Sequence, residues 1–181
     1  RLEIATFQTV NAISTAGYNS IPLSSLTLGV LLTIIFLMYV GAAPSSTGGG
    51  MKITTLTAVI AIVKSKVRNQ AKVTYLGKKI PADRLEMAVS TFIFYTAILF
   101  FSVFLLSFTE NHSLEKLLFE ATSAIGTVGL SMGITGSLSV WGKIILISIM
   151  FIGRVGVITF GLAILAKKQH KKIDNETDLA V

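Results

Sequence analysis

Two short segments of the chain carry residues that are suited to binding a cation through backbone oxygen atoms. They are Thr15-Ala16-Gly17 and Thr127-Val128-Gly129. A cation that loses its water needs a ring of oxygen atoms, and an extended backbone can present several carbonyl groups toward one axis. Glycine permits the torsions that this requires, and the threonine hydroxyls can add oxygen atoms at the inner edge. We therefore expect both segments to line an ion-selectivity filter.

The two segments occupy matching positions in a tandem repeat with a shift of 112 residues and no gaps. A lone Thr-x-Gly tripeptide would mean little, because such tripeptides occur in ordinary loops. Its recurrence between the same kinds of segment favours the filter. The matched pairs are Phe7 and Phe119, Ala12-Ile13 and Ala124-Ile125, Thr15 and Thr127, Gly17 and Gly129, Leu26 and Leu138, Met38 and Met150, and Gly41 and Gly153.

The composition predicts a membrane protein and excludes a soluble domain, since 52% of the residues are hydrophobic and 14% are charged. Cysteine is absent, which leaves neither a disulfide framework nor a cysteine-ligated metal site. No carboxylate, histidine or serine constellation falls at a shared membrane depth, so we do not expect an enzyme. A filter needs about four convergent segments, and a further N-terminal part is expected before Arg1.

Short and long apolar stretches must position the two segments. Residues 3–14 have apolar side chains at helical spacing but cannot cross about 30 Å of hydrocarbon. We expect a re-entrant pore helix there, and a second pore helix with its filter over residues 113–131. Membrane-spanning helices are expected over residues 23–43, 87–108 and 144–166.

The stretch after the first spanning helix predicts a broken helix. Pro44-Ser45-Ser46-Thr47-Gly48-Gly49-Gly50 interrupts two apolar runs, the second over residues 51–63. Irregular backbone at membrane depth is tolerated only against protein or a water-filled cavity, so the break should lie on the pore. A phosphate-binding loop is disfavoured, because G-x-x-x-x-G-K-[ST] is not matched.

Basic residues predict the sides of the membrane. Seven lysines and arginines lie between Lys64 and Arg84, with Asp83 as the single acid, and four lysines lie between residues 167 and 172. By the positive-inside rule, residues 64–84 and 167–181 should both be cytoplasmic.

Arg154 lies near the middle of the last expected span, where an unpaired charge costs on the order of 3 kcal/mol. The 112-residue shift pairs it with Ala42, beside the break, where freed carbonyls and hydroxyls could accept hydrogen bonds. A local helix carbonyl or snorkelling is the alternative. For Glu120 and its repeat mate Gln8, added negative potential and simple hydrogen bonding both remain open.

Taken together, the paired filter segments, the interrupted helix Gly41 to Gly50, Arg154 and the short basic C-terminus resemble the Trk/Ktr/HKT superfamily of potassium transporters, and most of all the Ktr-type bacterial membrane subunit. A family member has four helix-pore-helix repeats. The resemblance assigns residues 1–63 to a third repeat without its outer helix, 64–84 to a cytoplasmic linker, 85–166 to a complete fourth repeat, and 167–181 to a cytoplasmic tail.

The resemblance implies an all-α membrane protein of the bacterial plasma membrane that takes up potassium through one pore per subunit. Potassium would bind at the backbone of Thr15, Ala16, Gly17, Thr127, Val128 and Gly129. The gate would comprise Gly41, Pro44, Ser45, Ser46, Thr47, Gly48, Gly49, Gly50 and Arg154. The resemblance also implies a homodimer in the lipid bilayer and a cytosolic ring of nucleotide-binding regulatory subunits, with sodium as an activator in some members. Neither a covalently bound cofactor nor a nucleic-acid partner is expected.

Two other functions are compatible with parts of the sequence. A secondary transporter could hold its substrate at broken helices, but it would not require Thr-x-Gly tripeptides after short helices. A structural or regulatory membrane subunit would explain the apolar spans but not Arg154 or the glycine-rich break. Counting the re-entrant segments by cysteine accessibility would discriminate among the three.

Overall fold

The structure, a computed structural model, describes residues 2–41, 43–44, 48–69, 73–75 and 77–161. These residues are predominantly helical, as an all-α membrane protein requires. The α-helices are α1 (Leu2–Ser14), α2 (Leu28–Val40), α3 (Ile53–Val67), α4 (Ala82–Thr109), α5 (Leu114–Ile125) and α6 (Val140–Val155). Short 3-10 helices cover Leu23–Ser25 and Thr135–Ser137, and strands β1 (Thr74–Tyr75) and β2 (Lys78–Lys79) form an antiparallel pair.

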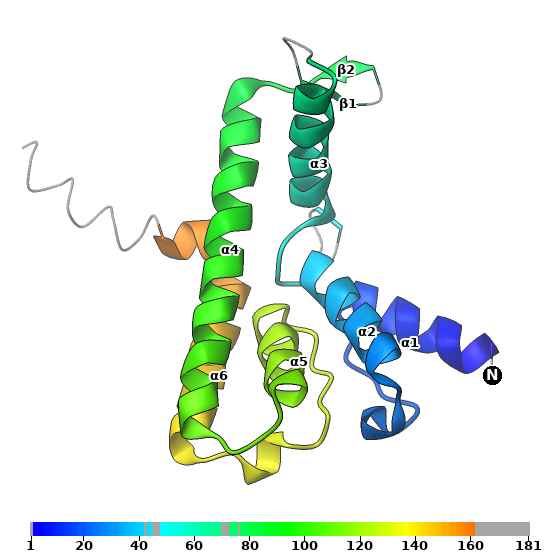
Figure 1. Ribbon diagram of the computed structural model, residues 1–181, viewed down its shortest axis with the longest axis vertical. Coiled ribbons are helices and arrows are strands. Elements are labelled where there is room, and N and C mark those ends of the chain that lie inside the picture. Colours follow the sequence, from blue (N-terminus) through cyan, green and yellow to red (C-terminus); the bar gives the residue numbers. More distant parts are fainter. Residues whose placement is uncertain (1, 42, 45–47, 70–72, 76, 162–181) are drawn as a thin grey trace, which may run out of the picture.

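The long helix α4 runs along the molecule (Figure 1). Helix α3 packs beside the end of α4 nearest the strands, and α6 packs beside the other end. Helix α5 packs against α2, α4 and α6. One buried cluster joins α4, α5 and α6 around residues such as Leu106, Leu117 and Ile125. A second cluster joins α1 and α2 to α5 through Ala12, Met38 and Phe119. Helix α5 therefore lies where both repeats meet.

Helix α4 matches the expected span over residues 87–108 and begins earlier, directly after Pro81. Within the described ranges it is the one helix both long and apolar enough to cross a membrane. The linker expected over residues 64–84 contains the strand pair, which the sequence analysis did not predict.

The other two expected spans are interrupted, so the prediction of continuous helices was wrong at their ends. Residues 23–27 do not belong to α2, which begins only at Leu28, and Gly41 at φ 60° ends α2. Helix α6 ends at Val155 because Gly156 adopts φ 94°, a torsion that an α-helix cannot contain. Residues 157–161 are helical again, and the rest of that expected span lies outside the described residues.

Helix α1 presents its apolar side chains outward. Ile4, Phe7, Val10 and Ile13, the residues that predicted the helix, are all exposed, whereas Gln8, Asn11 and Ala12 are buried. The polar face of α1 therefore faces the protein, and its apolar face is free for lipid or for other parts of a larger protein.

Candidate cation-binding site

The two Thr-x-Gly segments, Thr15–Gly17 and Thr127–Gly129, have the same unusual backbone. Thr15 and Thr127 adopt φ 57° and 53°, and Gly17 and Gly129 adopt φ 76° and 90°. Positive φ is rare for a β-branched residue and costs on the order of 1–3 kcal/mol. Two threonines at equivalent repeat positions thus share a strained conformation, which such a residue keeps only when its surroundings enforce it.

Each segment is tied to the helix before it by an equivalent backbone hydrogen bond. Ala16 N–H donates to Asn11 O at 3.3 Å, and Val128 N–H donates to Ser123 O at 2.9 Å. Both pairs obey the 112-residue shift. The repeat found in the sequence is therefore also a repeat in the local backbone geometry.

The segments meet at their glycines. A Cβ atom added to Gly17 would overlap the carbonyl oxygen of Val128 and lie 3.3 Å from the Cα atom of Gly129. A Cβ atom added to Gly129 would lie 3.6 Å from the Cα atom of Gly17. Because both glycines also have positive φ, any side chain at Gly17 would meet both strain and a backbone atom. The fold thus brings together the residues that sequence analysis predicted to bind a cation.

The glycine run, Gly48–Gly50, lies directly against the second segment. Gly49 is buried, and its N–H donates to Thr127 Oγ1 at 2.7 Å. A Cβ atom on Gly49 would lie 2.6 Å from that hydroxyl oxygen and 3.0 Å from Gly153 O. The ammonium of Lys52 donates to Gly48 O at 2.5 Å and so ties the run to the start of α3. The interrupted helix and the candidate filter are thus joined by a hydrogen bond.

The remaining residues expected in the gate are only partly placed. A Cβ atom on Gly41 would lie 2.7 Å from Met51 O and 3.4 Å from Gly49 O, so the two ends of the break adjoin. Pro44 is exposed. Ser45, Ser46 and Thr47 lie outside the described residues, as does Ala42, so the expected contacts of Arg154 with them remain a prediction. Arg154 itself is exposed in the last turn of α6, next to Gly153.

Glycine is also required where α6 crosses the end of α5. A Cβ atom on Gly153 would overlap Ile125 O, and one on Gly126 would lie 3.1 Å from Met38 O. Because Gly126 and Gly153 have no side chains, α6 and α2 can approach the turn that leads into Thr127.

Buried polar side chains of α1 and α5 hold the residues that follow each glycine. Asn11 hydrogen-bonds both backbone groups of Tyr18: its Oδ1 accepts from Tyr18 N–H at 3.1 Å, and its Nδ2 donates to Tyr18 O. Glu120 accepts from Ser131 and Thr135 hydroxyls at 2.6 and 3.0 Å and from Met132 N–H at 3.0 Å. Glu120 therefore forms hydrogen bonds with the loop that follows Gly129. Sequence analysis missed Asn11, although an amide inside a short apolar helix was a detectable signal.

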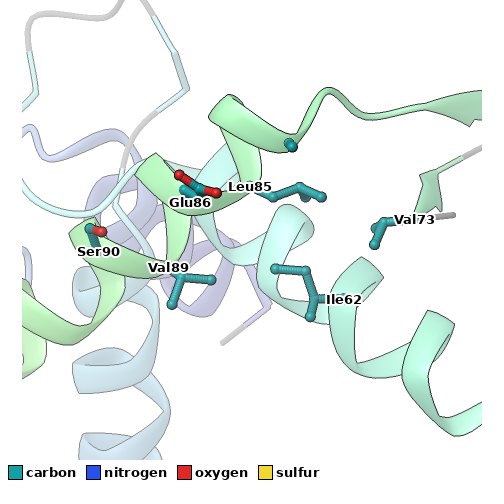
Figure 2. A pocket seen from close by; sticks show the side chains of 7 residues that line it. Ile62, Val73, Leu85, Glu86, Val89 and Ser90 are labelled. Carbon is teal, nitrogen blue, oxygen red and sulfur yellow. The ribbon is translucent and has the colours of Figure 1, made fainter. Parts of the chain in front are cut away.

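A separate cavity of about 540 Å³ lies between α3, α4 and the residue before β1. Figure 2 shows Ile62 of α3 and Val89 of α4 at its walls, with Glu86 and Ser90 on the α4 side. It is far along α4 from α5 (Figure 1), and none of its lining residues belongs to the Thr-x-Gly segments or the glycine run.

Comparison with known proteins identifies the family. The chain belongs to the TrkH family, described as cation transport protein, whose model matches residues 1–175. It is 38% identical over 169 residues to Ktr system potassium uptake protein D of Bacillus subtilis, covering 93% of this chain and 37% of that protein. It is 38% identical over 155 residues to Ktr system potassium uptake protein B of Vibrio alginolyticus, covering 86% of this chain and 34% of that protein.

A further relative is the potassium/sodium uptake protein NtpJ of Enterococcus hirae, 35% identical over 157 residues, with 84% of this chain and 35% of that protein covered. The chain thus spans little more than a third of the length of these relatives. Membership of a cation transport family, together with the apolar helix α4, identifies a membrane protein. The resemblance noted in the sequence is confirmed at the level of the family.

The bond between Gly49 and Thr127 predicts a difference between the two threonines. Thr127→Val keeps the shape of the side chain but leaves the buried N–H of Gly49 without its acceptor, which costs about 1–3 kcal/mol of unfolding free energy. We expect faster amide hydrogen exchange over residues 48–52 in the full-length protein. Thr127→Ser should retain wild-type protection. Thr15→Val is the matched control, and equal exchange in the two valine variants would contradict the assignment.

Proposed function

We propose that the full-length protein takes up potassium through a pore to which Thr15–Gly17 and Thr127–Gly129 contribute backbone carbonyl oxygens. The observation that carries the proposal is the meeting of two repeat-equivalent segments at Gly17 and Gly129, each with positive φ at its threonine and its glycine. Short pore helices, α1 and α5, would re-enter the membrane to hold them. Four such segments around one axis would form a complete filter.

The alternating torsions support a role for the carbonyl groups. Positive φ occurs at the first and third residue of each segment but not at Ala16 or Val128 between them. Reversing the sign of the torsions from one residue to the next turns successive peptide planes so that their carbonyls can face the same side. Such a row of oxygens can replace the water around a potassium ion. Within the described ranges no group of three or more histidine, aspartate or glutamate side chains could hold a metal instead.

Potassium is the proposed ion because relatives that are 35–38% identical to this chain over the aligned residues are named as potassium uptake proteins. The name of the Enterococcus hirae relative includes sodium as well. We propose potassium as the transported ion and sodium as a candidate activator or competitor. Transport in the presence and absence of sodium separates these two roles.

Replacing a segment glycine should impair the choice of ion. In Gly17→Ser or Gly129→Ser, a Cβ atom at positive φ distorts the carbonyl ring, and at Gly17 it also meets Val128 O. We expect weaker potassium affinity or a smaller preference for potassium over sodium, with expression little changed. Uptake of rubidium by proteoliposomes, in competition with potassium and sodium, measures both. Gly136→Ser is the control, since no atom lies within 4 Å of a Cβ there. Wild-type kinetics and selectivity in both segment variants would refute the proposed filter.

The chain would cross the bacterial plasma membrane several times, as the third and fourth repeats of a homodimeric subunit. Residues 64–84 would then be a cytoplasmic linker within reach of a cytosolic nucleotide-binding ring. This linker includes the end of α3, with Lys64, Lys66 and exposed Arg68, and the strand pair with Lys78 and Lys79. Acidic surfaces of a ring would complement these charges.

Sidedness can be measured at the end of α3. A single cysteine at Asn69, which is exposed, should resist an impermeant thiol reagent added outside intact cells and should react after the cells are opened. A cysteine at Asn111, in the exposed turn between α4 and α5, should show the opposite pattern. Labelling of the Asn69 position from outside would overturn the topology.

We further propose that the break between α2 and α3 gates the pore beneath the second segment. Gly49 touches Thr127, and Gly153 O lies close to Gly49, so the run sits between the second segment and the residue before Arg154. Consecutive glycines cost about 1 kcal/mol each relative to alanine in a helix, so the run does not favour a helix, and the hydrogen bonds of Gly49 N–H and Gly48 O are what hold it in place. Arg154 is the proposed hydrogen-bond donor that holds the rest of the break in the closed position.

Weakening the gate should raise flux more than it changes affinity. Deleting residues 45–49, or Arg154→Ala, should increase the maximal rate of potassium uptake with smaller changes in apparent KM than the glycine-to-serine variants cause. Lys168→Ala, in the tail, is a control for simple loss of a positive charge. Unchanged or abolished uptake in well-expressed loop deletions would place the gate elsewhere and leave the break as a structural bend.

A further inference from the structure

Gln8 of α1 and Glu120 of α5 occupy equivalent repeat positions, and both side chains are 5% exposed. Each reaches the residue two places after its segment glycine. Gln8 Nε2 donates to Asn19 Oδ1 at 3.0 Å, and Ser131 Oγ donates to Glu120 Oε1 at 2.6 Å. Asn19 and Ser131 are themselves separated by 112 residues. A side-chain hydrogen bond between helix and loop is therefore repeated in the structure, although the residue types differ in both equivalent pairs, Gln8 with Glu120 and Asn19 with Ser131.

The hydrogen bonds made by Gln8 and Glu120 differ in the other hydrogen bonds that accompany them. In the first repeat, Asn11 adds two hydrogen bonds to the backbone of Tyr18, the residue directly after Gly17. The equivalent position in the second repeat is Ser123, which is too short to bridge in the same way. Glu120 instead gathers three donors, the hydroxyls of Ser131 and Thr135 and the N–H of Met132. The carboxylate of Glu120 thus holds the loop after Gly129, whereas the amides of Gln8 and Asn11 together hold the loop after Gly17.

The chemistry of Glu120 suits this position. An ionised carboxylate only accepts hydrogen bonds, and hydrogen bonds to it are roughly twice as strong as those between neutral groups. Glutamine could not accept from all three donors without turning its NH₂ group toward one of them. A cavity of about 180 Å³ lies between Glu120, Ser123, Gly129 and Ser131, so the carboxylate and the segment glycine line the same space. A negative charge there also favours a cation on the opposite side of the glycine.

We propose that Glu120 is a positioning residue that sets ion affinity and selectivity by fixing the loop after Gly129, as Asn11 and Gln8 together do for the loop after Gly17. This inference rests on the proposed function. When the hydrogen bonds between Glu120 and the loop are lost, the carbonyl oxygens of Thr127–Gly129 lose their fixed spacing. A ring with loose spacing discriminates less between potassium and the smaller sodium ion.

Glu120→Gln in the full-length protein is the direct test. We expect the KM for rubidium uptake to rise more than about tenfold, as the loss of one charge-assisted hydrogen bond predicts, with the maximal rate changed less. Sodium should compete more effectively than in wild type. Glu120→Asp, which keeps the charge on a shorter stem, should recover part of the affinity. Glu115→Gln is the matched control, because it removes the same charge from an exposed position of the same helix and should behave as wild type.

Ser131→Ala tests the geometry separately, since it removes one donor and leaves the charge of Glu120 in place. It should shift KM and sodium competition in the same direction as Glu120→Gln, but less. If Glu120→Gln lowers only the melting temperature or the yield, while KM and sodium competition stay at wild-type values, Glu120 is structural and the inference fails. If the glycine variants shift selectivity and neither Glu120→Gln nor Ser131→Ala does, the filter stands and this inference alone falls.

Discussion

The backbones of the two Thr-x-Gly segments approach each other closely at Gly17 and Gly129. A side chain at Gly17 would have no room beside Val128 O, and both glycines adopt a torsion that other residues rarely adopt. The helices before them end in the same way, with the same hydrogen bond from the middle residue of the segment to the preceding helix. The glycine run then packs against the second of these segments, because Gly49 lacks a Cβ atom at the point of contact with Thr127.

The sequence alone predicted much of this arrangement, because tandem repetition carries structural information that a single motif does not. The shift of 112 residues located both short helices and both glycine-containing segments, and it paired Gln8 with Glu120 before any contact was known. The apolar length of α4 and the break after Gly41 followed from composition and from helix-breaking residues. These features depend on local torsions and on the thickness of a bilayer, both of which a sequence expresses directly.

Other features could not be predicted, because they depend on contacts between distant residues. Hydropathy suggested a continuous helix through Gly156, and a single glycine in an apolar run does not reveal its torsion. The strand pair of residues 74–79 lies in a polar stretch without alternation of apolar residues. The contact of Gly49 with Thr127 joins residues 78 positions apart and follows only from the folded chain. The hydrogen bonds made by Asn11 and Glu120 could be identified only from the positions of the side chains in the folded chain.

If a cation binds where the two segments meet, as we propose, the ion itself can be located there. Thallium or rubidium can be located by anomalous scattering in crystals of the full-length protein, with sodium as the comparison. We expect density on an axis beside the carbonyl groups of Thr15–Gly17 and Thr127–Gly129, reduced or displaced when sodium replaces the heavier ion. Density at the broken helix alone, with none beside Gly17 and Gly129, would rule out the proposed filter and favour a secondary transporter that binds its substrate at the broken helix.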